Sequence, residues 1–340
     1  MIISEKYYLR PTGICAVKQF ARDPGVKGGG FYYSADGTAI SLGDKSKPLE
    51  DKKPNQISIE SRKKMRNSLN NLYAISDIKK VYSKATKKSF SFKLNFITLT
   101  LSSEQKHSDV YIKRNMLEPI IKWLQYNHKM NSYVWKAEPQ NNGNIHFHIT
   151  TNIFIHYAAI RNKWNDLQGK HNYIPDKYTM IEDDVPNSTD IHSIRNAAKC
   201  IMYMQKYLTK LHEKKKYMSL SCEVGKSEYY KRSFEWLPGD DGYLFEHKRM
   251  IDGQYWNCSL NLKQAPASFE TEQLMYSAEF NKWVHSHSRK ILFNEFATMI
   301  YTDHESMLQL PKRVRKYYTR YIDFMKLHEH KKKYYSVESL

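Results

Sequence analysis

Two histidines spaced as alternate residues of a strand are the strongest chemical feature of the sequence. Residues 145–149 read Ile-His-Phe-His-Ile. Because successive side chains of a strand point to opposite faces, His146 and His148 share one face, about 7 Å apart along the strand. The three apolar residues then enter the core. Two imidazoles placed in this way can converge on a divalent metal ion.

A carboxylate is predicted to lie opposite these histidines. Two β-rich runs, 132–138 and 144–151, are separated by a Pro/Asn/Gly cluster, which is a hairpin signal. If the hairpin turns about Asn142, Glu138 pairs directly with His146, and cross-strand partners share a face. We therefore expect Glu138 to be the third ligand. This mixed nitrogen and oxygen set suits Mg²⁺ or Mn²⁺ acting on phosphates.

A pair of tyrosines supplies a possible nucleophile. A helix is expected from about 196 to 212, and on it Tyr203, Lys206 and Tyr207 share one polar stripe. A phenol has a pKa near 10, but a nearby ammonium or metal ion favours the phenolate. A phenolate can attack a phosphodiester and hold the product covalently.

Both spacings also recur elsewhere in the chain, so neither is specific alone. With 26 tyrosines in 340 residues, about two pairs with the Tyr-x3-Tyr spacing are expected by chance. The other His-x-His pairs fall in polar segments predicted to be helical, where residues two apart do not share a face. These further copies are His285/His287, His328/His330 and Tyr317/Tyr321.

The elements around these residues predict an α+β fold with a central antiparallel sheet. Residues 96–101 alternate, with Thr98 and Thr100 on one face and apolar residues on the other, as in a half-buried strand. Strands and helices interleave without a regular βαβ repeat. Helices are expected at about 57–72, 109–128, 157–167 and 312–333, and a short strand near 191–194.

Taken together, these features resemble an HUH endonuclease of the rolling-circle replication initiator type. That family has a strand motif similar to residues 96–101, then a His-hydrophobic-His strand, then a helix with a catalytic tyrosine. Residues 96–210 carry all three in that order. The Tyr-x-x-Lys-Tyr form is similar to the two-tyrosine initiators of microviruses and some plasmids.

The resemblance implies a residue role at each position and a reaction. The expected activity is metal-dependent nicking of single-stranded origin DNA by transesterification, which leaves a 5′-phosphotyrosine and a free 3′-OH, followed later by rejoining. The expected fold is the HUH nuclease fold, in which helices, including the tyrosine helix, flank the sheet. The implied metal ligands are His146, His148 and Glu138, the paired nucleophiles are Tyr203 and Tyr207, and Lys206 is their electrostatic helper.

Composition favours a nucleic-acid partner. The chain has 54 Lys and Arg against 35 Asp and Glu, a formal net charge of +19, and 26 Tyr, 14 Phe and 6 Trp for stacking. Such an excess attracts a polyanion, with single-stranded DNA as the leading choice. No run approaches about 18 apolar residues, so no membrane span is expected. The absence of a secretory signal and four scattered cysteines indicate the cytoplasm of a bacterial host.

Three regions are expected along the chain. Residues 1–56 are predicted to be an N-terminal extension and linker poor in regular structure, 57–213 the endonuclease domain, and 214–340 a basic, aromatic region for DNA binding or an accessory role. The segment ending in Gly225-Lys226-Ser227 lacks the first glycine of a phosphate-binding loop. Unwinding is therefore expected to depend on a host helicase, and synthesis on a host polymerase.

Two alternatives stay open. A relaxase or single-strand transposase shares the metal site and the tyrosine helix, although the two-tyrosine spacing favours replication. A basic, non-catalytic nucleic-acid-binding protein would instead use the same histidines and tyrosines structurally. It would bind DNA in a salt-sensitive way without forming a covalent adduct.

Overall fold

The computed structural model divides into two compact units, residues 1–56 with 268–321 and residues 57–267 with 322–340. Each unit is described by itself. The structure describes residues 2–20, 31–33, 39–41, 58–83, 87–140, 142–175, 186–194, 214–216, 243–245, 250–266, 268–272, 277–293 and 297–331.

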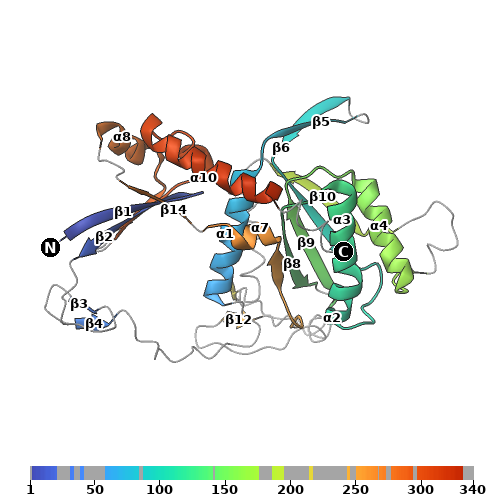
Figure 1. Ribbon diagram of the computed structural model, residues 1–340. Coiled ribbons are helices and arrows are strands. Elements are labelled where there is room, and N and C mark those ends of the chain that lie inside the picture. The colour runs from blue at the N-terminus through green and yellow to red at the C-terminus, as the bar shows by residue number, and fades with distance from the viewer. Residues whose placement is uncertain are drawn as a thin grey trace. The chain divides into compact units, whose positions relative to one another are not determined.

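The second unit is built on a five-stranded antiparallel sheet in the order β10-β7-β9-β8-β13 (Figure 1). The predicted strand at 96–101, the hairpin and the strand near 191–194 are all confirmed. The fifth strand comes from much later in the chain and pairs with β8. The strands are β7 (Leu94–Thr100), β8 (Tyr133–Pro139), β9 (Ile145–Thr151), β10 (Thr189–Ile194) and β13 (Trp256–Cys258).

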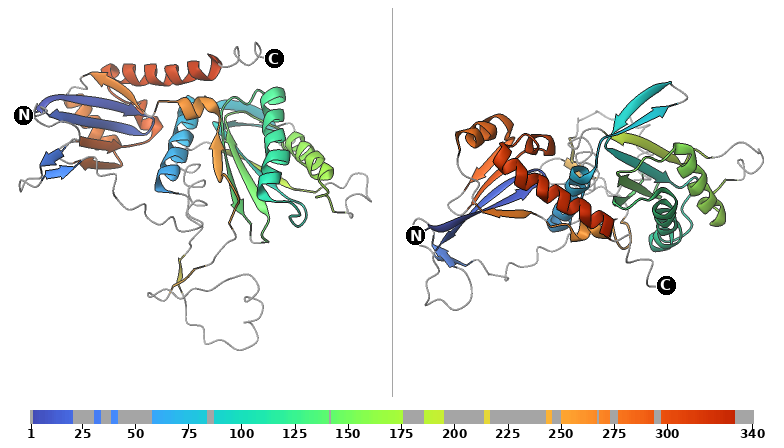
Figure 2. Two further views of the ribbon diagram at one scale, coloured as in Figure 1. Left: turned by 60° about the horizontal axis from the view of Figure 1, so that its bottom comes forward. Right: turned by 45° about the horizontal axis from the view of Figure 1, so that its top comes forward.

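Helices cover both faces of this sheet (Figures 1 and 2). One face packs its apolar residues, among them Ile97 and Phe147, against α2, η1, α3 and α4. On the other side lie α1 and α7, and α1 contacts β8 and β13. These elements are α1 (Ile59–Ile75), α2 (Asp109–Ile112), the π-helical turn η1 (Lys113–Leu117), α3 (Glu118–His128), α4 (Tyr157–Lys170) and α7 (Leu260–Gln264).

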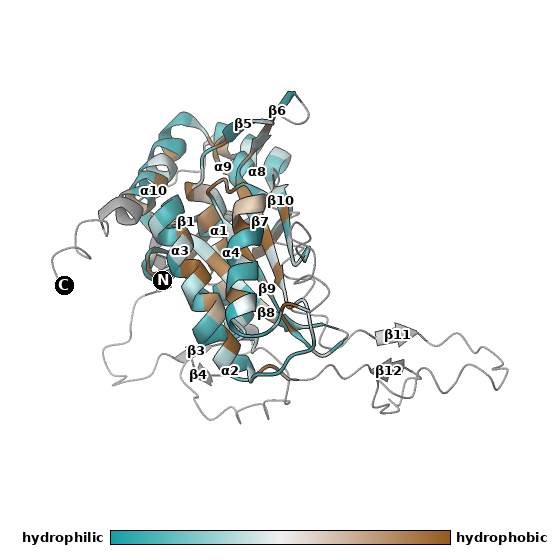
Figure 3. Cartoon of the chain, turned by 90° about the vertical axis from the view of Figure 1, so that its right-hand side faces the viewer, coloured by the Kyte–Doolittle hydropathy of each residue, from teal (hydrophilic) through white to brown (hydrophobic). Residues whose placement is uncertain are grey.

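The helices begin and face the core as the sequence indicates. The hydroxyls of Ser58 and Ser108 accept hydrogen bonds from the third residue of α1 and α2, so both are N-caps. Leu124 and Trp164 are fully buried in the core beneath the sheet. Hydrophilic and hydrophobic residues therefore both appear along α3 and α4 (Figure 3).

A two-stranded hairpin leads directly into β7. It consists of β5 (Lys79–Ser83) and β6 (Lys88–Phe92), which pair antiparallel. Two further short pairs are β3 (Phe31–Tyr33) with β4 (Ala39–Ser41), and β11 (Lys214–Lys216) with β12 (Tyr243–Phe245).

The first unit contains a second five-stranded antiparallel sheet, in the order β14-β1-β2-β16-β15. The prediction that residues 1–56 are poor in regular structure was therefore wrong for β1 and β2, whose outer partners come from about 250 residues later. The elements are β1 (Ile2–Arg10), β2 (Gly13–Phe20), β14 (Phe269–Glu272), α8 (Ala278–His287), β15 (Lys290–Phe293), β16 (Ala297–Tyr301), α9 (His304–Met307) and α10 (Lys312–Lys331).

The fold class is α+β with antiparallel sheets, as predicted. Across the described residues, none of the helices is both long and apolar enough to span a membrane.

Candidate metal centre

The turn between β8 and β9 sets the register on which the site depends. The amide of Gln140 donates to the carbonyl of Asn144 at 2.8 Å, and the amide of Gly143 donates to the carbonyl of Gln140 at 3.0 Å. Gly143 has a φ of +85°, a left-handed conformation that glycine adopts without strain. This turn pairs Glu138 with His146, as the sequence predicted.

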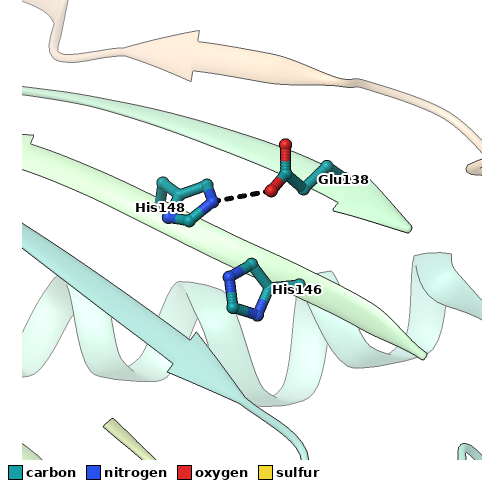
Figure 4. Close-up of side chains that lie close together, drawn as sticks. All are labelled: Glu138, His146 and His148. Atoms are coloured by element: carbon teal, nitrogen blue, oxygen red, sulfur yellow. Dashed lines mark hydrogen bonds and ion pairs between the residues drawn. The ribbon is translucent and has the colours of Figure 1, made fainter. Parts of the chain in front are cut away.

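The three predicted ligands come together on one face of the hairpin (Figure 4). Glu138, His146 and His148 each offer a ligand atom, and these atoms lie within 4.8 Å of one another. Nε2 of His148 is 2.8 Å from Oε1 of Glu138, and the two imidazole rings are 4.5 Å apart. In the part of the chain that the structure describes, this is the one such group of three.

A buried lysine completes the charge balance around Glu138. Lys136 lies two residues earlier on the same face of β8, is 2% exposed, and its Nζ donates to Oε2 of Glu138 at 2.9 Å. Burial alone would raise the pKa of Glu138. The hydrogen bond from His148 and the positive charges of Lys136 and His148 outweigh this effect and lower the pKa to about 2. The carboxylate is therefore ionised at neutral pH.

His146 is held in its neutral form. Burial, followed by the positive charge of His148, lowers its pKa, and the charge of Glu138 offsets only part of that shift, so the pKa falls to about 4. A neutral imidazole and an ionised carboxylate are the protonation states that bind metals.

Two threonines of β7 hold the outer nitrogens of the histidines. The Oγ1 atom of Thr98 is 3.1 Å from Nδ1 of His148, and Oγ1 of Thr100 is 3.0 Å from Nδ1 of His146. The strand register produces both contacts, because Thr98 pairs with His148 and Thr100 with His146. A hydroxyl can accept a proton from Nδ1, and in that tautomer the lone pair stands on Nε2.

This set of side chains fits a divalent cation. It offers two imidazole nitrogens and one carboxylate oxygen, and Phe96 stacks on His148 with ring centroids 4.9 Å apart, which restricts the ring. Since Nε2 of His148 now faces the carboxylate, metal binding must replace the proton between them. Thr98 then provides the acceptor for a proton on Nδ1. The identity of the metal does not follow from these residues.

Neighbouring titratable residues are placed differently. Asp190 and His192 on β10 form an exposed ion pair at 2.6 Å, and β7 separates their strand from the histidine strand. They are not part of the ligand group. The other His-x-His pairs lie on α8 and α10, so they are helical as predicted.

The second Tyr-x3-Tyr pair has a structural role. Tyr321 is fully buried and lies beside Phe269, with ring centroids 6.0 Å apart. Burial raises the pKa of its phenol well above the usual value, which disfavours a phenolate. The pair at Tyr317 and Tyr321 is therefore a poor nucleophile.

The predicted nucleophiles Tyr203 and Tyr207, with Lys206, lie outside the described residues. Their roles, and the helix expected to carry them, stay predictions.

One comparison with known proteins bears on the site. Residues 94–212 match the model of a family described as replication-associated protein, of the ORF2 type. This match supports a role as a replication initiator. It covers 119 of the 340 residues, begins with β7, and includes the ligand group and the tyrosine pair. No curated protein and no solved structure matches the chain.

The sequence prediction missed Lys136, Thr98 and Thr100 as parts of the site. The threonines were placed correctly on one strand face, and the register of β7 against β9 would have brought them to the histidines. Lys136 has a weaker signal: it lies two residues from Glu138, so it shares its face.

Proposed function

We propose that the protein initiates rolling-circle replication by nicking single-stranded origin DNA through metal-dependent tyrosine transesterification, and later rejoins the strand. The observation that carries the proposal is the convergence of Glu138, His146 and His148 on one sheet face, inside the segment that matches a replication-associated family.

Each ligand residue has a defined task. His146 and His148 present imidazole nitrogens, and Glu138 presents an ionised oxygen that Lys136 keeps deprotonated. Thr98 and Thr100 orient the two rings. When bound, a divalent cation, Mg²⁺ or Mn²⁺, supplies positive charge that polarises a non-bridging oxygen of the scissile phosphate.

The chain supplies the nucleophile for the covalent step. The Oη atom of Tyr203 or Tyr207 attacks phosphorus in line, and an Oη–P bond forms as the bond from phosphorus to the 3′ oxygen breaks. The phenol gives up its proton and the 3′ oxygen takes one, so a 3′-hydroxyl and a 5′-phosphotyrosine result. Lys206 stabilises the phenolate. The retained ester lets the second tyrosine or a 3′-OH reverse the step without ATP.

The regions of the chain have corresponding roles in this proposal. Residues 57–213 form the endonuclease domain of the HUH type, 1–56 are an extension and linker, and 214–340 contribute DNA binding or an accessory role. The reaction takes place in the cytoplasm of a bacterial host, with a host helicase and polymerase as partners.

A covalent trapping assay tests the proposal. Wild-type protein is incubated with a labelled library of single-stranded DNA and Mn²⁺, beside an EDTA control, and run on a denaturing gel. We expect a shifted band that needs the metal and disappears in the variant Tyr203→Phe with Tyr207→Phe. Tyr317→Phe is the matched control, since it removes a hydroxyl from the other pair, and it should keep the band.

Two results would contradict the proposal. Tight, salt-sensitive binding without an adduct across a broad library would indicate a non-catalytic nucleic-acid-binding protein. An adduct that persists in the double phenylalanine variant would place the nucleophile elsewhere.

A further inference from the structure

The hairpin of β5 and β6 is a basic ribbon that extends beyond the sheet of the second unit (Figure 1). Residues 78–103 contain six lysines and no acidic residue. A run of this length without a carboxylate is unusual for a solvated surface, where both charge signs normally mix.

One face of the ribbon is used for packing. Phe90 and Phe92 on β6 form an aromatic cluster with Phe154, with ring centroids 5.8 to 6.4 Å apart. Phe92 is 1% exposed, and Val81 pairs with Phe90 on the same face. This cluster anchors the ribbon to the segment that follows β9.

The opposite face presents a cation and an aromatic ring to solvent. Lys80 and Tyr82 alternate with the packed residues of β5, and they pair with Ser91 and Ser89 across the ribbon. Tyr82 is 59% exposed, and Lys80 is exposed as well. Lys88 starts β6 at the turn end of the ribbon, where it is also exposed and adds a charge beside this face.

An exposed ring flanked by cations and small hydroxyl side chains is the arrangement that binds single-stranded nucleic acid. Lysines attract the phosphates, and an aromatic side chain stacks on an unpaired base without regard to its identity. A duplex offers no unstacked base face to Tyr82 along its length.

The ribbon is also joined to the candidate metal centre by continuous chain. From Ser91 on the ribbon to Thr100 at the site, the chain advances nine residues, or at most about 30 Å at about 3.3 Å per residue. Both lie in the second unit.

We propose that the ribbon surface formed by Lys80, Tyr82 and Lys88 is a second binding surface for single-stranded DNA, separate from the metal ligands. It holds the strand by phosphate attraction and by stacking on Tyr82. This inference rests on the proposed function, because it takes the DNA at the ribbon to be the strand that reaches the metal centre.

The test compares two variants of the full chain with equal changes in charge and ring content. The ribbon variant is Lys80→Gln, Tyr82→Ala and Lys88→Gln. The control variant is Lys122→Gln, Tyr126→Ala and Lys170→Gln on α3 and α4, where Tyr126 is 83% exposed. Binding of a labelled single strand and of a duplex of equal length is measured by anisotropy in EDTA across a salt series.

We expect the ribbon variant alone to lose affinity for the single strand, roughly 5- to 100-fold from the lost stacking. The slope of log K against log[salt] should fall in magnitude by about 1.4, or about 0.7 for each lysine removed. If the triple variant does not fold, Tyr82→Ala alone should still lose affinity while keeping the slope.

Three results would overturn the inference: equal losses in both variants, no loss in either, or an equal loss on the duplex. The proposed function is read separately, from adduct formation at saturating DNA with Mn²⁺. Failure of the nicking proposal removes the adduct from wild type, whereas failure of the ribbon inference leaves the adduct intact and the binding unchanged.

Discussion

Replacing Glu138 by glutamine should destabilise the second unit more than any surface substitution. The change keeps the size of the side chain but removes its charge. It leaves Lys136, which is 2% exposed, as a buried ammonium without its carboxylate. Removing one partner of a buried ion pair costs about 3–5 kcal/mol, because the remaining charge is uncompensated.

The pKa of Glu138 gives an independent figure for the same effect. Its pKa is about 2 in the folded chain against 4.5 as the ordinary value. A difference of about 2.5 units corresponds to about 3 kcal/mol of stability at neutral pH. Both routes agree, so we expect Glu138→Gln to lower the free energy of unfolding by about 3 kcal/mol.

Hydrogen exchange measured by mass spectrometry on peptides covering β8 and β9 reports this free energy in the full chain. Glu60→Gln on α1 is the matched control, since its ion pair with Lys64 is exposed, and it should change little. Adding Lys136→Met to Glu138→Gln should restore part of the loss, because no unpaired charge then remains buried.

The pH dependence has a defined sign. Because the folded pKa of Glu138 lies below the unfolded value, its stabilising contribution is complete above about pH 4.5 and is lost as the pH falls towards about 2. The gap between wild type and Glu138→Gln should close over that range. Equal protection of wild type and variant at pH 7, or a larger loss after adding Lys136→Met, would refute the reasoning.

Three further predictions concern the histidines, their threonine partners and the metal. Because the pKa of His146 is about 4 instead of 6.5, wild type should lose about 3 kcal/mol of stability between pH 6.5 and 4, and His146→Asn should lack this loss in urea unfolding; the same slope in both would contradict it. Thr98→Val and Thr100→Val should each weaken Mn²⁺ binding by about tenfold or more in calorimetry, and unchanged affinity would remove their positioning role. EDTA should abolish adduct formation but leave single-strand binding in place, whereas a parallel loss of binding would tie DNA affinity to the metal.

The local part of the fold and the pairing of the site could be predicted from the sequence. The hairpin turn and the alternation of residues 145–149 fix which residues face each other, so Glu138 opposite His146 followed from counting. Helices with regular apolar spacing were predictable for the same reason, since their signal lies within a few turns.

Long-range pairing was not predictable. The strands β1 and β2 are completed by β14 and β16, about 250 residues away, and no local pattern announces those partners. The burial of Lys136 was also hidden, because a lysine in an alternating strand ordinarily points to water. Only the tertiary cover over this sheet face decides that it is buried.

The central claim is that a tyrosine near the metal ligands becomes joined to DNA. The most direct test is to react the full chain with labelled single-stranded DNA and Mn²⁺, digest it with protease, and identify the nucleotide-linked peptide by mass spectrometry. The account predicts a phosphodiester on Tyr203 or Tyr207 that is absent with EDTA and in Glu138→Gln. A linkage at another residue, or none despite tight binding, would contradict it.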